Sequence, residues 1–533
     1  MTLTPAIARA APPAKPDDFT MRDEYLVDTG RIEGSGALAN ALALQLHGEL
    51  ELRFRALTTL PLTAPASAPT ATTLGQNDYL YTWLRLNPRL YYKDKLSLVG
   101  QIDIPRGLVL GDVTQYVSTA REPLDDQKFY RVYPRWLYLE YESPIGVLRL
   151  GQQGSHWAMG LVANDGDHPQ MFGDNVGGSI VERLLFATTP LGRGTPLVIA
   201  LGADLVLTDP TARLIEDGDE ALEAVLAALW RTKHAEAGVY GVIRHQTRDE
   251  QATGAFTPFT DQLTVGVVDA TGKFDAPVPA MPLGRIYGQI EAAWIVGSTD
   301  YLRDTYTQQA SATGAHTDES VRSFGAAATL GVLRMSGLEE AFGKLVTEVE
   351  LGYASGDADP YDGVTKRFTF DPNHHVGLVL FNQVLAWKTA RAAYDASDPG
   401  LVARAAPGVG FLPSNGGVFG AAYVNPRATF RPKKWLDLKA GLVIAQTTAD
   451  LVDPYRFGAL GTVKNYDGGD AKKHDLGLEL DGGVDVRVPI EKRVTFQFGV
   501  EAGVLFPGHA FDDAAGKAMP DQALINAKLG AEF

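Results

Sequence analysis

The residues of this sequence with the clearest capacity for chemistry are charged side chains that occur at every second position. Glu49, Glu51, Arg53 and Arg55 are separated by single leucine or phenylalanine residues. Because successive side chains of a β-strand point to opposite faces, this spacing places the charges on one face and the apolar residues on the other. Such a face can line a wet channel and attract a solute, or it can brace the wall through ion pairs. Both interpretations stay open.

Charges of the same kind occur on the polar faces of other predicted strands, and together they form the candidate pore lining. Its members are Arg53, Arg55, Arg85, Arg89, Glu348, Glu350, Arg427, Arg431, Asp481 and Arg487. Cations and anions on these faces nearly balance, which predicts a wet lumen that is locally positive near the four arginines of the N-terminal strands.

Patterns that indicate catalysis are weak. The 10 histidines are scattered apart from the pair His374 and His375, and neither an HExxH pattern nor a cysteine occurs. Ser155 and His156 are adjacent, but adjacent residues of a strand point apart, so they do not form a nucleophilic pair. We therefore expect neither enzyme activity nor a cofactor.

One acidic loop is a weak candidate for a metal. Asp357, Asp359 and Asp362 precede Gly363 at a spacing that superficially resembles a calcium loop, but the distal glutamate is missing. The favoured interpretation is an ordinary acidic loop, and we expect no metal.

Long alternating segments predict the elements that position these charges. The clearest are residues 46–57, 80–90, 96–104, 286–296, 345–353, 424–430, 476–488, 494–506 and 523–533, none with a charge on its apolar face. A soluble β-sandwich also alternates, but many of these segments reach the length of about 10 residues that a tilted transmembrane strand needs. The predicted fold class is all-β, a single transmembrane antiparallel β-barrel.

Weaker candidates complete the barrel. They are residues 130–142, 147–153, 179–189, 196–208, 222–233, 238–248, 262–269, 321–335, 376–388 and 435–446. Residues 219–232 also fit an amphipathic helix. The candidates exceed 18 by one, and because bacterial barrels have an even number of strands we predict about 18.

The connections between the predicted strands alternate in length. Short ones, such as residues 144–146, alternate with long ones at residues 64–77, 355–375, 396–416 and 453–473, which are rich in Gly, Pro, Asp and Asn. This pattern predicts short periplasmic turns and long extracellular loops, some of which can fold into the lumen.

Composition excludes several classes of protein. Hydrophobic residues make up 45% of the chain and charged residues 21%, and no run of about 18 apolar residues occurs, which argues against membrane helices. The net charge of −16 without a basic cluster argues against a nucleic-acid partner. The 56 glycines and 20 tyrosines suit the turns and interfaces of a barrel in the outer membrane of a Gram-negative bacterium.

We expect two parts in the chain. Residues 1–45 are predicted to be a leader or residual signal with an N-terminal segment, and residues 46–533 the outer-membrane β-barrel. The first residues lack the apolar core of a signal peptide, but Ala8-Arg9-Ala10 fits a small-x-small cleavage site. An alanine- and proline-rich soluble leader is the alternative. At the other end, Phe533 resembles the signal read by barrel insertases.

Several stretches resemble the alginate-export family of outer-membrane porins. Residues 349–357 read VELGYASGD and residues 368–374 read FTFDPNH, while LGLELDGGVD at 476–485 and GVLFPGHAF at 503–511 are similar to the penultimate strands of that family. The match is best over the last third of the chain. It implies a barrel of about 18 strands that exports a polysaccharide.

The resemblance also implies which residues contact the sugar. They are Arg53, Arg55, Arg85, Arg149, Arg427 and Arg431, with the loop at residues 353–362. The alginate exporter has a strongly cationic pore, whereas the lumen predicted here is balanced. This difference favours a neutral or mixed polymer.

The sequence therefore predicts a passive outer-membrane porin that exports a secreted polysaccharide. Its expected partners are this polymer, outer-membrane lipid and periplasmic export and synthesis machinery, and we expect a monomer. A general or solute-specific uptake porin is the alternative. An outer-membrane enzyme or adhesion barrel is a further alternative from a different class.

Overall fold

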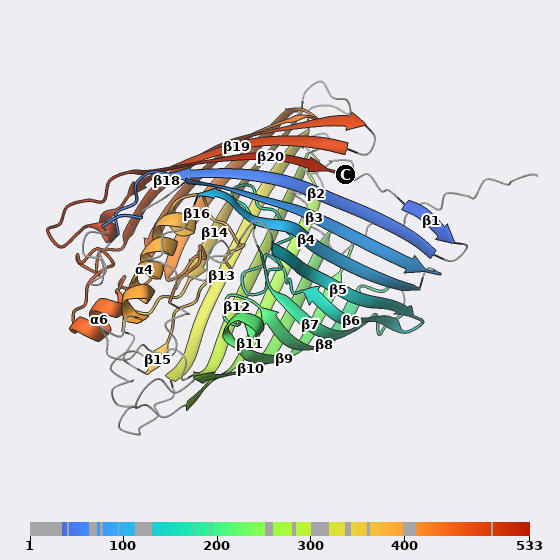
Figure 1. The fold of residues 1–533 in the computed structure, drawn as a ribbon, viewed down its shortest axis with the longest axis horizontal. Coiled ribbons are helices and arrows are strands. Elements are labelled where there is room, and N and C mark those ends of the chain that lie inside the picture. Colours follow the sequence, from blue (N-terminus) through green and yellow to red (C-terminus); the bar gives the residue numbers. More distant parts are fainter. Residues whose placement is uncertain are drawn as a thin grey trace, which may run out of the picture.

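A computed structural model of the protein describes residues 35–39, 42–62, 72–74, 78–93, 95–111, 131–175, 177–192, 194–250, 259–279, 284–299, 319–335, 343–359, 363–397, 412–491 and 494–533. The described residues form a β-barrel that encloses several helical and irregular segments (Figure 1).

Eighteen antiparallel strands close the barrel, as predicted. They are β2 (Leu42–Leu57), β3 (Asp78–Tyr92), β4 (Leu96–Gly111), β5 (Arg131–Ser143), β6 (Gly146–Gly154), β7 (Ile180–Thr188), β8 (Leu197–Thr208), β9 (Glu220–Arg231), β10 (Ala235–Glu250), β11 (Phe259–Pro277), β12 (Arg285–Thr299), β13 (Glu319–Met335), β14 (Lys344–Ala354), β16 (Ala421–Lys433), β17 (Leu436–Thr447), β18 (Asp475–Glu491), β19 (Val494–Pro507) and β20 (Gln522–Glu532). The first and last of these pair with each other, with Glu49 opposite Glu532 and Leu57 opposite Leu524. The closed ladder leaves no unpaired edge facing lipid.

Two shorter strands join this sheet. β1 (Ser35–Ala39) pairs with the start of β2, and β15 (Val364–Thr365) pairs in parallel with the start of β13. β1 and the first residues of β2 fall in the segment that was expected to precede the barrel, so the barrel wall begins at Leu42. Residues 1–34 lie outside the described residues.

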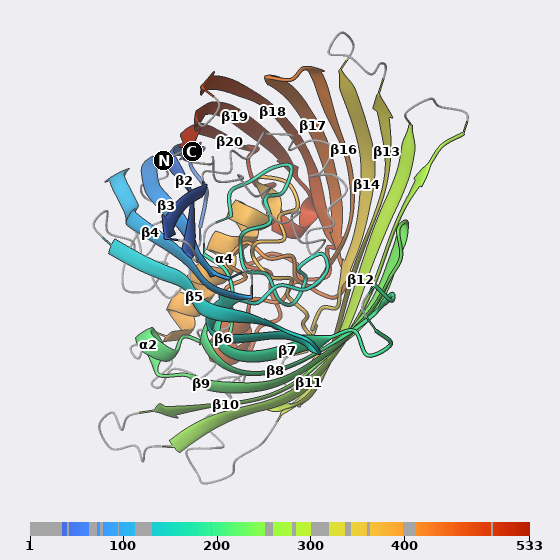
Figure 2. The same cartoon turned by 90° about the vertical axis from the view of Figure 1, so that its right-hand side faces the viewer.

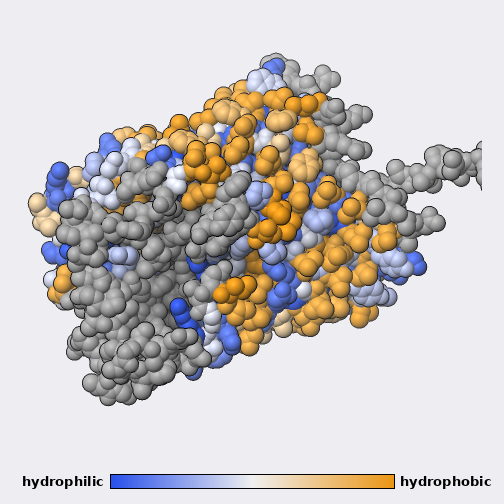
Figure 3. Space-filling model, viewed as in Figure 1, coloured by the Kyte–Doolittle hydropathy of each residue, from blue (hydrophilic) through white to orange (hydrophobic). Residues whose placement is uncertain are grey.

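Side chains alternate between the two faces of the wall. In β10, Val239 and Ile243 are 54% and 67% exposed on the outer face, whereas Tyr240 and Val242 are buried on the inner face. Figure 3 shows apolar residues spread across the outer surface of the strands. An apolar outer belt on a closed barrel is the surface that a bilayer requires, so the protein is an outer-membrane β-barrel.

The connections alternate as expected. The short ones include Pro144-Ile145 between β5 and β6 and residues 492–493 between β18 and β19, and the long ones lie at the opposite end. Long connections join β14 to β16 and β17 to β18. Short turns are periplasmic and long loops extracellular. Among the described residues, no helix is long and apolar enough to cross a membrane.

Two strand predictions needed the structure to decide them. Residues 376–388 are not a strand, because η2 (Leu380–Leu385) is a π-helical segment that continues into α4 (Ala386–Ser397) inside the barrel. Their residues are buried on nearly every side, and a short apolar run of this kind has no periodicity that separates helix from strand. Residues 219–232, which also fitted a helix, form β9. Removing the first candidate and keeping the second accounts for the even strand number.

Three further helical segments lie in connections. α2 (Leu214–Asp217) lies between β8 and β9, α6 (Pro454–Leu460) between β17 and β18, and η4 (His509–Phe511) between β19 and β20. The carboxylate of Asp453 caps α6 by accepting from the backbone N–H of Tyr455 and Arg456.

We expect Val239→Arg to destabilise the barrel in lipid by about 2–4 kcal/mol, because the residue projects from the outer face of β10 into the hydrocarbon. The free energy of unfolding from lipid vesicles, measured by urea titration, tests this. Val239→Leu is the matched control and should change it little. An equal stability of the arginine variant would contradict a lipid-facing position.

Candidate functional site

Three inward-folded segments occupy the barrel lumen. We call them the first lumen loop (the described residues of 155–179), the second lumen loop (the described residues of 355–420) and the third lumen loop (residues 448–474). Figure 2 shows them, with α4, inside the ring of strands. One apolar cluster joins them, with Leu161 and Phe172 from the first, Phe370 and Phe381 from the second and Tyr466 from the third. The lumen therefore has a packed core of its own.

Carboxylates of the wall hold the backbone of these loops. Glu479 on β18 accepts hydrogen bonds from the backbone N–H groups of Leu378, Val379 and Leu380 at 2.5, 2.7 and 2.7 Å. Glu291 on β12 accepts from Met159 and Leu161 at 2.5 and 3.1 Å. These groups satisfy loop donors that otherwise lie buried without a partner.

A third anchor uses a charge pair. Glu501 on β19 accepts from the backbone N–H of Gly173 at 3.1 Å and pairs with Lys439 at 2.9 Å. The ammonium of Lys439 donates to the carbonyl of Met171 at 2.9 Å. Glu501 and Lys439 therefore each bind the backbone of the first lumen loop in addition to forming an ion pair with each other.

The predicted residues Glu348, Glu350 and Arg427 lie together on β14 and β16. Arg427 pairs with Glu348 at 3.0 Å and with Glu350 at 2.8 Å. Glu350 also accepts from the hydroxyl of Tyr423 at 2.6 Å and contacts His374 Nε2 of the second lumen loop at 3.1 Å. All of these side chains are buried, so their charges are neutralised within the protein.

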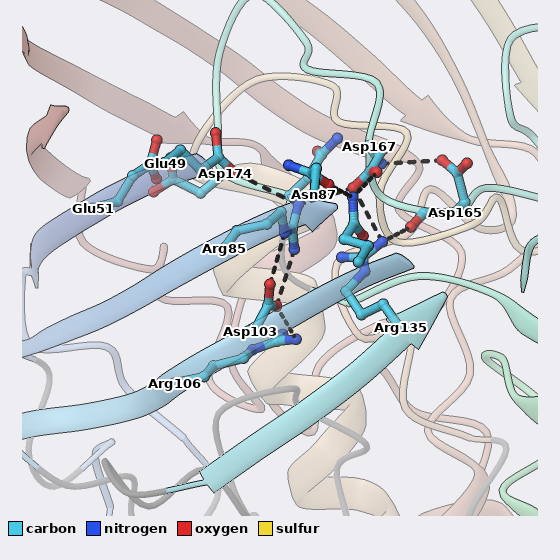
Figure 4. A network of polar contacts seen from close by, with 12 residues as sticks. Glu49, Glu51, Arg85, Asn87, Asp103, Arg106, Arg135, Asp165, Asp167 and Asp174 are labelled. Atoms are coloured by element: carbon cyan, nitrogen blue, oxygen red, sulfur yellow. Dashed lines mark hydrogen bonds and ion pairs between the residues drawn. The ribbon is translucent and has the colours of Figure 1, made fainter. Parts of the chain in front are cut away.

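Two of the predicted arginines of β2 and β3, Arg53 and Arg85, pair with aspartates of the first lumen loop. Arg85 pairs with Asp103 at 2.7 Å and with Asp167 of that loop at 2.9 Å. Figure 4 shows Arg85 and Arg135 directed at Asp167, with Arg106 beside Asp103. The loop thus supplies part of the negative charge that balances the locally positive region predicted here.

Arg53 has a similar position one strand away. It pairs with Glu51 at 2.6 Å and with Asp174 of the first lumen loop at 3.3 Å, and its guanidinium lies 3.8 Å from the ring centre of Trp83. Arg55 donates to Asn526 at 3.1 Å.

The remaining predicted residues pair with carboxylates of the wall. Arg89 and Arg149 share Glu140 at 2.9 and 2.7 Å. Arg431 and Arg487 share Asp437 at 2.6 and 2.7 Å. Both groups lie at the end of the barrel that carries the short turns. Asp481 is buried beside Glu479, two positions along the same face of β18. A role of any of these residues in contacting a solute stays a prediction.

In the acidic loop that was a weak candidate for a calcium site, the carboxylate of Asp357 accepts backbone hydrogen bonds. Asp357 Oδ1 accepts from the backbone N–H of Asp359 at 3.1 Å and Oδ2 accepts from that of Lys366 at 2.9 Å. Asp362 lies outside the described residues.

A cavity of about 390 Å³ lies between the lumen loops and strands β7 to β13. Its wall side carries six valines, with Tyr240 and Arg244 from β10, and its loop side carries Phe368, Phe419 and Arg367. Carboxyl groups also line it, and they belong to Asp209, Glu223, Glu319, Asp357, Asp371 and Asp450. Arg244 pairs with Asp209 at 2.5 Å and Glu223 at 3.1 Å.

Arg367 has no ion pair with a carboxylate of the described residues, and Asp357 acts on it only through a longer-range electrostatic interaction. Its guanidinium donates to the carbonyl of Leu412 at 3.0 Å and stacks 4.0 Å from the ring centre of Phe419, while Nε and Nη2 are buried without an acceptor. Burial lowers the pKa of Arg367 from its ordinary value. Sequence reasoning missed this residue because it lies in a loop without periodicity.

Comparison with solved structures finds barrels of similar shape. OccAB1 of Acinetobacter baumannii has 9% sequence identity and a TM-score of 0.47, covering 92% of this chain and 97% of that one. The outer membrane protein OpdK of Pseudomonas aeruginosa has 10% identity and a TM-score of 0.46, covering 92% and 98%. OccK2 (OpdF) of Pseudomonas aeruginosa, in complex with glucuronate, has 9% identity and a TM-score of 0.45, covering 92% and 98%. No protein-family model and no curated protein matches the sequence.

These findings correct the functional prediction. Export of a polysaccharide is wrong, because loops joined by one apolar cluster fill the lumen where a polymer needs an open conduit. The resemblance to the alginate-export family is supported only in its general feature, an outer-membrane β-barrel of 18 strands.

We expect Glu479→Ala to release the second lumen loop, because three buried N–H groups then lose their acceptor at a cost of about 1–3 kcal/mol each. Single-channel recordings should show a larger and noisier conductance. Asp437→Ala removes a wall carboxylate that pairs with two wall arginines and serves as control. Equal conductance in both variants would contradict the anchoring role.

The packing of the loops should also weaken in acid. His375 lies against Gly173, with Nδ1 2.9 Å from Asn382 Oδ1, and burial lowers its pKa from 6.5 to about 4. Between pH 6.5 and 4 the imidazole of His375 binds a proton when the loop is released but not when it is packed. The free energy that favours the packed loop is therefore fully present above pH 6.5 and falls by up to about 3 kcal/mol as the pH falls to 4. As the pH falls from 6.5 to 4, the open probability of single channels should rise more steeply in the wild type than in His375→Gln. Open probabilities that change with pH in the same way in both proteins would refute this.

Proposed function

We propose that this chain is a passive outer-membrane channel for the uptake of small solutes. The observation that carries the proposal is the division of the lumen: three inward-folded loops, packed into one apolar cluster, occupy it and leave a cavity of about 390 Å³ beside the wall. Cavities of roughly 300–1,000 Å³ suit a small organic molecule. A lumen of this kind selects solutes by size and chemistry.

The lining of the cavity supports a solute with an apolar body and an acidic group. Valines of the wall and the rings of Phe368, Phe419 and Tyr240 offer apolar contact. Arg367 offers buried N–H donors without a carboxylate partner among the described residues. Burial raises the pKa of Asp371, one of six carboxyl groups in the lining, to about 8, so this carboxyl is largely neutral at pH 7. Two of the others, Asp209 and Glu223, are paired with Arg244.

Two of the solved structures that the chain resembles hold acids of this size. OpdK was solved with vanillate and OccK2 (OpdF) with glucuronate. For the present chain the proposal depends on Arg367 and the cavity. It requires no catalytic group, since the solute crosses unchanged.

The test is the block of single-channel current by benzoate, with benzyl alcohol as its neutral counterpart. We expect benzoate alone to block, and Arg367→Met to weaken the block about tenfold or more, because a buried charge-assisted hydrogen bond contributes about 1.5–3 kcal/mol. Arg487→Met, which changes an arginine paired with Asp437 at 2.7 Å, is the matched control.

The outcomes separate the two parts of the proposal. An unchanged block in Arg367→Met would overturn the acidic solute and leave the channel standing. Correctly folded protein that conducts no current at any pH would overturn the channel itself.

A further inference from the structure

The first lumen loop carries a cluster that neither the ion-pair network nor the cavity explains. His156, Asp165 and His168 each offer one ligand atom, and these atoms lie within 4.8 Å of one another. Asp165 Oδ1 is 3.0 Å from Nδ1 of His168 and 3.8 Å from Nδ1 of His156. The two imidazole rings are stacked, with centroids 3.5 Å apart.

The hydrogen bonds of His156 determine which of its nitrogens bears the proton. Its Nε2 lies 3.2 Å from the carbonyl oxygen of Ala158, which can only accept, so Nε2 donates. In the neutral ring Nδ1 then has a bare lone pair, and it is buried without a hydrogen-bond partner. This lone pair faces the Asp165 carboxylate, and two acceptors that face each other repel unless a cation lies between them.

We infer that His156, Asp165 and His168 form a binding site for a divalent transition-metal ion such as Zn²⁺. Two imidazoles and one carboxylate are the ligand set of many sites that leave a position open for water. Donation of the second ring nitrogen to a backbone carbonyl is also the usual way in which a metal-binding histidine is oriented.

The distances fit such an ion. Ligand atoms about 2.1 Å from a zinc ion are about 3.0 Å apart at a right angle and about 3.4 Å apart at a tetrahedral angle. The separation of 3.0 Å between Asp165 Oδ1 and His168 Nδ1 equals the first value, and the separation of 3.8 Å to His156 Nδ1 would shorten by about 0.4 Å to reach the second. The ring planes are only 17° apart, so one imidazole must turn out of the stack for both lone pairs to meet the ion.

The surroundings hold Asp165 in place. Its Oδ1 accepts from the backbone N–H of Asp167 at 3.0 Å, and Arg135 donates to its backbone carbonyl. Figure 4 shows Asp165 beside Arg135 and Asp167, at the edge of the ion-pair network. Because Ser155, Val162 and Ala163 of the same loop line the cavity, a bound ion would restrain the loop that borders the solute path.

The experiment is isothermal titration of the purified full chain, without a histidine tag, with Zn²⁺. We expect one ion per chain, and visible d–d absorption when Co²⁺ is the probe. His156→Asn and His168→Asn should each weaken binding at least about tenfold. His234→Asn, at an exposed histidine on the short turn before β10, is the matched control and should leave binding unchanged.

Folding of each variant is checked by the heat-dependent shift of the barrel on gel electrophoresis. For folded variants, equal Zn²⁺ binding in the wild type and in His156→Asn, or no binding in the wild type, overturns the site. If the histidine variants fail to fold, Co²⁺ absorption of the wild type decides: a spectrum with nitrogen ligation supports the site, and its absence refutes it. None of these readouts depends on which solute the channel passes.

Discussion

A closed barrel of 18 strands encloses more space than the inward side chains of its wall can fill, and the rest of this structure depends on how that space is occupied. Loops enter the lumen, and their irregular backbone needs hydrogen-bond partners there. The wall provides them as carboxylates, since one carboxylate accepts several N–H groups. Glu479 holds three successive residues at the start of η2, and Glu291 holds two residues of the first lumen loop.

The same constraint explains what happens to the charges of the lumen. A buried charge is costly unless it is paired, so the predicted pore-lining residues are used largely against one another or against loop carboxylates. Arg427 lies between Glu348 and Glu350, and Arg85 lies between Asp103 and Asp167. A lumen rich in charged residues is therefore not a broadly charged conduit. Its electrostatic character toward a solute is set by the few groups whose charge is left over, such as Arg367.

The first lumen loop connects the parts of the molecule. Its aspartates neutralise arginines of β2 and β3, its backbone binds Glu291 and Glu501, and its residues line one side of the cavity. Because the same loop is anchored to the wall and lines the cavity, a change in its packing would change the width of the proposed solute path beside it. Anchoring and selectivity are properties of one network.

The sequence by itself determined the barrel, its strand number to within one, the lipid-facing residues and the alternation of turns and loops. Lipid imposes these features residue by residue, since a strand must keep charges off its outer face. Only the tertiary structure decided that residues 376–388 are helical, that Arg427 and Arg85 are paired, and that Arg367 is not. These outcomes depend on partners far apart in the chain: Met159 and Glu291 are separated by 132 positions, and Leu378 and Glu479 by 101. Periodicity reports which face a side chain occupies, but the group it meets across the lumen is chosen by the folding of the loops.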